Sequence, residues 1–148
     1  MKKTRYTFII IATAILASLA SCTLETSDAG DYDGFWHLTR MDTIATGGVN
    51  DMSKEKIFWS FQNKLMEADD KSGAHQSILM RYEQTKTQLT LNTPYAYDRD
   101  NGDKLLADST LLLPYGINKT EEKFDVVTLK GGKMVLQSEK LKLTFKRF

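Results

Sequence analysis

The sequence predicts an all-β domain, a small antiparallel up-and-down barrel of about eight strands, preceded by a signal peptide. Three observations support this fold class. After residue 33, apolar and polar side chains alternate, long stretches with a helical period are missing, and turn-forming residues recur at short intervals. Alternation gives each strand one apolar face for a core, and many short strands with tight turns are typical of an antiparallel barrel or sandwich.

Residues 1–21 have the pattern of a secretory signal. Three basic residues lie within the first five, residues 8–17 (FIIIATAILA) are almost entirely apolar, and small residues follow up to Ser21. The apolar run is shorter than the roughly 20 residues that a membrane-spanning helix needs, so a retained anchor or a buried core helix fits less well. We therefore expect residues 1–21 to be removed.

The next motif is Leu19-Ala20-Ser21-Cys22, which resembles the lipobox of bacterial lipoproteins. In that family a diacylglycerol is attached to the cysteine thiol, the signal is cut just before it, and the new amino group is often acylated too. The resemblance implies that Cys22 is the lipidated N-terminus, carrying acyl chains such as palmitate; a chance cysteine beside an ordinary cleavage site is the alternative. Two or more acyl chains anchor a protein stably, and the only cysteine is then unavailable for disulfides, metals or catalysis.

Residues 22–32 are expected to be a flexible tether, because they are polar and acidic and include a glycine. Removal of the signal lowers the basic residues from 20 to 17 against 19 acidic ones, a net charge of about −2. This balance gives no indication of binding to nucleic acid, which calls for a basic patch. Lipoproteins of the Bacteroidota carry acidic stretches here, so we expect outer-membrane attachment; the scattered acids leave the periplasmic or surface face open.

Residues 33–148 are expected to form one domain, with strands paired by short turns. The expected strands cover residues 35–43, 56–62, 64–68, 77–83, 87–91, 110–117, 124–129, 134–137 and 140–148. The last is the clearest, because Leu141, Leu143 and Phe145 share one face and lysines the other. Gly131-Gly132 predicts a tight hairpin, since primed turns need positive φ.

Two segments between these strands are expected to differ from them. Residues 50–55 could form one helical turn with Asn50 or Asp51 as its N-cap. Residues 95–106 could form a small hairpin outside the main sheet, with a turn at 100–103.

Gly34-Phe35-Trp36 opens the first strand, and Arg147 lies near the end of the last. This pair resembles the lipocalin pattern, and the whole domain is similar to the short lipocalin-like lipoproteins of the Bacteroidota. The resemblance implies that Trp36 plugs one barrel end, after Gly34, and that Arg147 packs across the indole ring. Side chains two residues apart in a strand share a face, so Arg147 is also expected on the inward face with Phe145. A guanidinium over an indole ring contributes about 0.5–2 kcal/mol. A solvated terminal arginine is the alternative.

An eight-stranded barrel is just wide enough to be filled by side chains or to hold one small ligand. The inward positions are expected to be Trp36, Leu38, Ile57, Trp59, Phe61, Ile78, Met80, Tyr82, Leu89, Leu91, Leu111, Leu113 and Tyr115. Their bulk favours a mostly filled interior, although a cavity could be lined by Trp59, Phe61, Met80, Tyr82 and Tyr115.

Residues that carry chemistry are few. His37 and His75, the two histidines, lie at no ligand spacing from another histidine, cysteine or acid, so solvated positions are expected for both. No nucleophile-elbow pattern is present. In residues 98–103 the glycine is fifth, whereas a calcium-binding EF-hand loop has it sixth, which favours a plain turn. We therefore expect a protein that is not an enzyme, with no catalytic residue, metal or cofactor.

Two expectations about function follow. The first is a lipid-anchored envelope protein whose barrel binds a small apolar ligand or a partner protein. The alternative is a structural or accessory outer-membrane lipoprotein with a filled core and no ligand. Asp42-Thr43-Ile44 and Asp108-Ser109-Thr110 also resemble the sites at which Bacteroidota O-glycosylate exported proteins, which would require Thr43 and Ser109 at the surface.

Overall fold

The structure is a computed structural model that describes residues 28–148. The predicted signal peptide, Cys22 and most of the predicted tether lie outside the described residues. Among the described residues, no helix has both the length and the apolar character that a membrane crossing requires.

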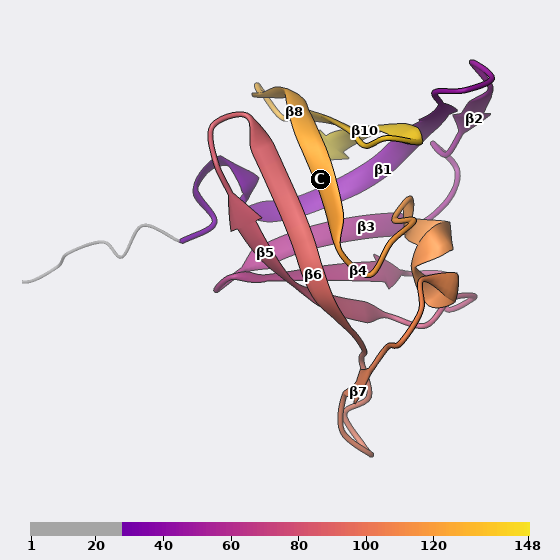
Figure 1. Ribbon diagram of the computed structural model, residues 1–148, viewed down its shortest axis with the longest axis vertical. Coiled ribbons are helices and arrows are strands. Elements are labelled where there is room, and N and C mark those ends of the chain that lie inside the picture. The colour runs from indigo at the N-terminus through magenta and orange to yellow at the C-terminus, as the bar shows by residue number, and fades with distance from the viewer. Residues whose placement is uncertain (1–27) are drawn as a thin grey trace, which may run out of the picture.

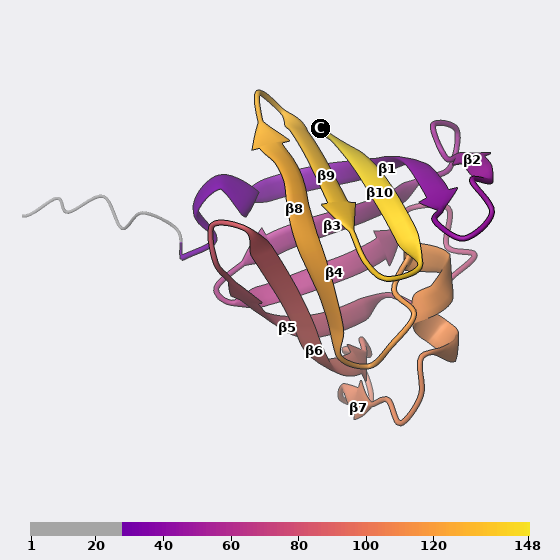
Figure 2. The same ribbon diagram turned by 45° about the horizontal axis from the view of Figure 1, so that its top comes forward.

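Ten strands and two short 3-10 helices make up the part of the domain that the structure describes. They are η2 (Gly30–Tyr32), β1 (Gly34–Thr43), β2 (Val49–Asp51), β3 (Ile57–Gln62), β4 (Leu65–Asp70), β5 (Ile78–Gln84), β6 (Gln88–Ala96), β7 (Lys104–Leu105), η3 (Thr110–Tyr115), β8 (Glu122–Lys130), β9 (Lys133–Gln137) and β10 (Leu141–Arg147). Eight strands pair in the order β1-β3-β4-β5-β6-β8-β9-β10, and β10 returns to pair with β1. The predicted all-β, antiparallel, up-and-down barrel is confirmed (Figures 1 and 2).

The predicted hairpins are present in the barrel. Asn63 and Lys64 form the turn between β3 and β4 with φ of 49° and 62°, and Gly131 and Gly132 join β8 to β9 with φ of 60° and 75°. These positive φ values match the right-handed twist of the flanking strands, as primed turns do. The small hairpin predicted within residues 95–106 is also present, because β7 pairs with the end of β6 outside the barrel path.

The two ends of the barrel differ in their connections. At one end the strands are joined by tight turns, and η2 precedes β1 there. At the other end β9 and β10 are joined by residues 138–140, but the other three connections are longer, and two of them contain β2, β7 and η3. Figure 1 shows η3 and β2 on the opposite side of the barrel from the point where the described chain begins. We call the second one the loop-rich end.

The prediction of a strand over 110–117 is wrong. Thr110–Tyr115 is the 3-10 helix η3, with Pro114 inside it. Leu112 and Tyr115, three residues apart, are buried, whereas Leu111 and Leu113, predicted to point inward, are 43% and 50% exposed. A three-residue period and a proline, which cannot donate to a central ladder, explain the difference.

Residues 50–55 also differ from the predicted helical turn. Asn50 and Asp51 belong to β2, which pairs with β1. The Asp51 side chain does accept a 2.9 Å hydrogen bond from the Ser53 N–H, as an N-cap would, but the backbone then makes a turn and not a helix.

The core fills the space inside the barrel. It combines inward residues of all eight barrel strands with residues of η2, η3 and the loops. The buried large side chains include Trp36, Leu38, Trp59, Phe61, Met66, Ile78, Met80, Leu89, Leu91, Tyr115, Phe124 and Phe145.

Candidate functional site

One end of the barrel is closed by η2 and the Trp36 ring. Trp36 is 1% exposed, and its Nε1 donates a 2.7 Å hydrogen bond to the carbonyl oxygen of Tyr32 in η2. The Tyr32 ring in turn packs against Phe61, with ring centroids 5.2 Å apart. These contacts fix η2 across the barrel opening, with aromatic rings packed beneath it.

Arg147 completes this end from the last strand. Trp36 and Arg147 are direct cross-strand partners, and the guanidinium carbon lies 4.9 Å from the indole centroid, within the range of a cation–π contact. Arg147 Nη2 also donates to the carbonyl oxygens of Asp31 and Asp33. Gly34 has φ of 113°, and a Cβ there would lie 3.6 Å from Arg147 Nε. Glycine therefore lets the chain turn into β1 beside the guanidinium.

The residues predicted to line a cavity lie within the packed core. Tyr82 is 6% exposed, and the other four, Trp59, Phe61, Met80 and Tyr115, are at most 1% exposed. The Trp59 ring lies 5.8 Å from that of Phe124 and 4.9 Å from that of Phe145, and Phe61 and Tyr82 meet edge to face. Four hollows on the barrel surface have linings that include none of the five residues.

Four buried side-chain polar groups have no hydrogen-bond partner among the described residues. One is the amide nitrogen of Asn118, after η3, and the other three lie in the barrel interior. They are the hydroxyls of Tyr32 and Tyr82 and the Nε1 of Trp59. Burial raises the pKa of Tyr32 to about 12, and the nearby Tyr82 adds to the shift. Burial also raises the pKa of Tyr82, followed by the charges of Asp28 and Asp33. Buried polar groups without partners are rare, so each calls for an explanation such as a small polar occupant.

The loop-rich end is closed by η3. Leu112 and Tyr115 are fully buried, and the Tyr115 hydroxyl donates a 2.9 Å hydrogen bond to the carbonyl oxygen of Gln76 in the β4–β5 connection. Burial raises the pKa of this hydroxyl above its usual range. Gly116 ends η3 with φ of 81°, and a Cβ there would lie 2.7 Å from Leu143 Cδ2. The backbone of this segment therefore packs directly on β10, which requires glycine.

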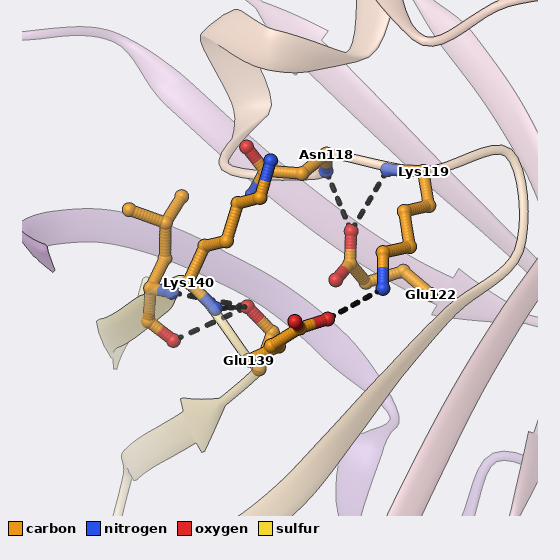
Figure 3. Close-up of polar contacts among 7 residues, drawn as sticks. Asn118, Lys119, Glu122, Glu139 and Lys140 are labelled. Carbon is orange, nitrogen blue, oxygen red and sulfur yellow. Dashed lines mark hydrogen bonds and ion pairs between the residues drawn. The ribbon is translucent and has the colours of Figure 1, made fainter. Parts of the chain in front are cut away.

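A buried carboxylate holds the segment that follows η3. Glu122 is 2% exposed, and its Oε2 accepts hydrogen bonds from the backbone N–H groups of Asn118 at 2.6 Å and Lys119 at 2.9 Å (Figure 3). Lys119 also forms a 2.6 Å ion pair with Glu139 in the β9–β10 connection. Since hydrogen bonds to a carboxylate are among the stronger ones, Glu122 ties this segment to the start of β8. Sequence reasoning missed this residue.

The outer side of the loop-rich end carries apolar side chains and a hollow. The hollow has a volume of about 310 Å³, and its lining includes Met41, Met52, Ile57, Leu113 and Pro114. Close to it along the chain lie the exposed residues Ile44, Val49 and Leu111. We call this hollow together with Ile44, Val49, Leu111 and Leu113 the loop-end surface. The lining also includes the polar residues Asn50, Glu55 and His75.

Comparison with known proteins agrees with this architecture. A family model described as a lipocalin-like domain matches residues 16–148. The chain belongs to the lipocalin-like domain family.

Two solved structures are similar to this lipocalin-like protein. A lipocalin-like protein from Bacteroides uniformis ATCC 8492 aligns with a TM-score of 0.60 and 21% identity, over 80% of this chain and 100% of that one. An uncharacterized protein from Bacteroides eggerthii DSM 20697 aligns with a TM-score of 0.54 and 20% identity, over 79% and 99% of the two chains. A comparison with curated proteins finds no match. At these identities the likeness shows the fold alone.

The two histidines of this lipocalin-like protein lie in different surroundings. His37 is half-buried at the surface, where its Nε2 donates a 2.7 Å hydrogen bond to the Glu55 carbonyl oxygen and its ring stacks on Phe58. His75 is exposed, near the Tyr115 ring. Within residues 28–148, no three histidine, cysteine or acidic side chains are grouped so that they could hold a metal ion.

Proposed function

We propose that this protein is a lipid-anchored lipoprotein of the outer membrane whose lipocalin-like barrel has a filled core and binds a partner protein through the loop-end surface. The observation that carries the proposal is that the barrel interior is packed and both ends are closed, by Trp36 with η2 and by η3. A small apolar molecule would have to displace core side chains to enter. The exposed apolar groups lie on the outside instead, on Leu111, Leu113 and their neighbours.

The place where the chain enters the barrel indicates that the loop-end surface binds a protein and not the lipid bilayer that anchors Cys22. Five residues, 23–27, separate Cys22 from the first described residue, Asp28, and the link from Cys22 to Asp28 can span at most roughly 20 Å. The chain enters beside η2, on the side opposite η3 (Figure 1). An anchor on Cys22 would therefore keep the η2 end near the lipid and direct the loop-end surface away from it.

The anchor is tested by replacing Cys22 with alanine and fractionating the cells. The expected result is that the Cys22→Ala protein moves from the membrane fraction to the soluble fraction. Mass spectrometry of the unaltered protein should show an acylated N-terminal cysteine and loss of residues 1–21. A variant that stays with the membrane would contradict the proposed anchor.

The docking surface is tested by photo-crosslinking in cells, with a photoreactive amino acid at position 113 or at position 65. Leu65 is a matched control, because its 41% exposure is close to the 50% of Leu113 but it lies at the other end of the barrel, at the start of β4. Position 113 is expected to give a specific crosslinked protein. The purified partner should bind the Leu113→Asp protein at least about tenfold more weakly, and the Leu65→Asp protein without change. Equal effects of the two substitutions would refute the loop-end surface as the binding site.

A second candidate function is the binding of a small ligand inside the barrel. It is favoured by the buried, unpartnered groups of Tyr32, Trp59 and Tyr82, which could hydrogen-bond a small polar or amphipathic molecule. Native mass spectrometry of protein purified from its own host separates the two candidates. A retained molecule of constant mass supports the ligand carrier, and protein that carries no bound molecule supports the filled core.

A further inference from the structure

The η2 end of the barrel carries exposed lysine side chains at each of its turns. Lys64 lies in the β3–β4 turn, Lys86 lies in the β5–β6 turn, and Lys130 and Lys133 flank the β8–β9 turn. Lys146 is close to the end of β10, where that strand meets β1. We call these five residues the lysine rim. The near-neutral composition of the chain does not reveal this local excess of positive charge.

Three lysines of the rim form a row across neighbouring strands. Lys133 in β9 is the register partner of both Lys130 in β8 and Lys146 in β10. Residues directly opposite each other in antiparallel strands lie on the same face of the sheet, and the adjacent Met134 and Phe145 point into the core. The three lysines therefore project outward together. Like charges in direct cross-strand positions destabilise a sheet, and a negatively charged partner would relieve their repulsion.

The lysine rim has no acidic partner within the described part of the chain. Three ion pairs are present among residues 28–148, and all of them lie toward the loop-rich end. They join Arg40 to Asp42, Lys71 to Asp69, and Lys119 to Glu139. The acids at the η2 end are Asp28, Asp31 and Asp33, and none of them forms an ion pair with the rim. The positive charge of the rim is thus available to a partner outside the barrel.

An exposed aromatic ring lies beside the lysine row. Phe148 is 85% exposed, but its N–H donates a 2.8 Å hydrogen bond to the Phe35 carbonyl oxygen, and its ring meets the Phe58 ring edge to face. Phe58 also stacks on His37, the register partner of Lys146. The Phe148 ring is therefore held next to the row. Lysines together with an exposed aromatic side chain are typical of surfaces that lie in the interface of a bilayer.

The point where the described chain begins indicates which negative charges are nearest. Gln84 Nε2 donates to the Asp28 carbonyl oxygen at 3.0 Å, so the chain enters beside the turn that contains Lys86. Figure 2 shows the β5–β6 and β8–β9 turns on this side of the barrel. The anchor proposed on Cys22 keeps this end within roughly 20 Å of lipid. The phosphate groups of anionic phospholipids are then the closest negatively charged partner.

We propose that the lysine rim and Phe148 dock the η2 end of the barrel onto a bilayer that contains anionic phospholipids. The inference rests on the proposed anchor at Cys22 and adds a second contact to it, because acyl chains alone leave the domain free to tilt. Each lysine close to an anionic membrane surface favours the docked state by roughly fivefold. Docking fixes the orientation of the barrel and directs the loop-end surface away from the membrane.

Single-molecule energy transfer from the barrel to labelled headgroups measures this docking in lipidated protein reconstituted into vesicles. Cys22 is the only cysteine in the sequence and is acylated in the lipidated protein, so Gln62→Cys or Leu105→Cys takes a single donor dye. Gln62 is exposed at the η2 end, and Leu105 is exposed at the loop-rich end. In vesicles rich in phosphatidylglycerol, transfer should be higher from position 62 than from position 105. The difference should shrink in phosphatidylcholine alone and in about 1 M salt, where the screening length is about 3 Å.

A variant without the row tests the role of the lysines. It carries Lys130→Gln, Lys133→Gln and Lys146→Gln. The ratio of docked to undocked protein should fall at least about tenfold, because three contributions of roughly fivefold are lost. The free energy of unfolding, measured by urea denaturation, should stay the same or rise, since like charges in cross-strand positions have been removed. A lower free energy of unfolding would assign the row a structural role and contradict the proposal.

A control variant loses the same charge at the other end of the barrel. It carries Lys54→Gln, Lys56→Gln and Lys140→Gln, all at exposed positions of the loop-rich end. These positions are about one strand length, roughly 20 Å, from the rim, which exceeds the screening length of about 10 Å in 0.1 M salt. The docked ratio should therefore change less than about twofold.

Three results would overturn the inference. They are equal effects of the two triple variants, transfer that does not depend on phosphatidylglycerol, and a row effect that appears only after envelope proteins are added, which would identify an acidic protein as the partner. Failure of the anchor is distinguished by flotation of the Cys22→Ala protein with vesicles. Flotation that requires phosphatidylglycerol and the lysine row would support the docking surface even if the N-terminus proved not to be acylated. Anchored protein whose energy transfer ignores the row would refute the surface and leave the anchor standing.

Discussion

The two ends of the barrel are both closed, but they are closed by different kinds of contact. At the η2 end, Trp36 and Arg147 are register partners on the first and last barrel strands, and both bind the backbone of η2. At the loop-rich end, η3 belongs to a long connection and is held by contacts to other loops and to the start of β8, through Tyr115 and Glu122. The first closure forms only when the barrel closes, whereas the second can open while the barrel stays intact. Local opening is therefore expected at the loop-rich end.

The largest expected effect is that of Trp36→Ala. Trp36 is 1% exposed and joins β1, η2 and Arg147, so its loss should lower the free energy of unfolding by about 3–5 kcal/mol. Urea denaturation measures this change. Phe148→Ala is the control, because Phe148 is 85% exposed and its truncation should change stability by at most about 0.5 kcal/mol. Similar values for the two variants would mean that Trp36 does not hold the η2 end together.

Gly116→Ala examines the other end. The new Cβ would lie 2.7 Å from Leu143 Cδ2 at a φ of 81°, so we expect a loss of about 2–3 kcal/mol. Hydrogen exchange should speed up mainly in residues 110–121. Gly102→Ala has a similar φ of 88° with no heavy atom within 4 Å of the Cβ, and should cost about 1 kcal/mol. If Gly116→Ala loosened all strands equally, the two ends would not be independent.

The contrast between the η2 end and the loop-rich end also explains how much of the structure the sequence could predict. The barrel, its hairpins and the pairing of Arg147 with Trp36 follow from two-residue alternation and glycine-rich turns, which are local signals. The Arg147 side chain itself is exposed. Leu111-Leu112-Leu113 has no alternation, and a short apolar run of this kind indicates a buried strand as readily as the 3-10 helix η3 that it forms. Gly116, just after Pro114 and Tyr115, was the available signal for a helix end.

Glu122 could not have been identified from the sequence. It is one of 19 acidic residues, and it is set apart only by burial opposite two backbone N–H groups. Those N–H groups belong to a loop whose path depends on how η3 packs. Side chains that hold long connections are fixed by tertiary contacts, which a local pattern does not encode.

Glu122→Gln should have a smaller effect than Gly116→Ala. The amide keeps an acceptor oxygen but loses the charge, so we expect a loss of about 1–2 kcal/mol and faster exchange at Asn118 and Lys119. Glu139→Gln is the matched control, because its ion pair with Lys119 is at the surface, with side chains 52% and 72% exposed. Ion pairs between such exposed side chains contribute little to stability, because solvent screens them. An equal response of the two variants would show that burial does not strengthen the Glu122 contact.

The smallest effect at neutral pH is expected for Tyr32→Phe at the η2 end. The Tyr32 hydroxyl is buried and has no partner among the described residues, so its removal should leave stability unchanged or raise it by about 1 kcal/mol. The free energies of unfolding of the unaltered protein and of Tyr32→Phe should diverge at alkaline pH. The pKa of Tyr32 is raised to about 12 in the folded state, whereas an unfolded tyrosine has a pKa of about 10. Above pH 10 the unfolded chain therefore loses a proton that the folded chain keeps, and the stability of the unaltered protein falls until about pH 12.

Tyr32→Phe removes this alkaline contribution from Tyr32 alone. The stability advantage of the variant, measured by urea denaturation at a series of pH values, should grow by roughly 1–3 kcal/mol between pH 9 and pH 12. Tyr115→Phe is the informative comparison, because the Tyr115 hydroxyl donates to Gln76 at the loop-rich end. That substitution should cost about 1 kcal/mol at pH 7, the opposite sign to Tyr32→Phe. If both substitutions lowered stability at pH 7, the Tyr32 hydroxyl would have a bound partner inside the barrel, and the interior ligand would become the better explanation.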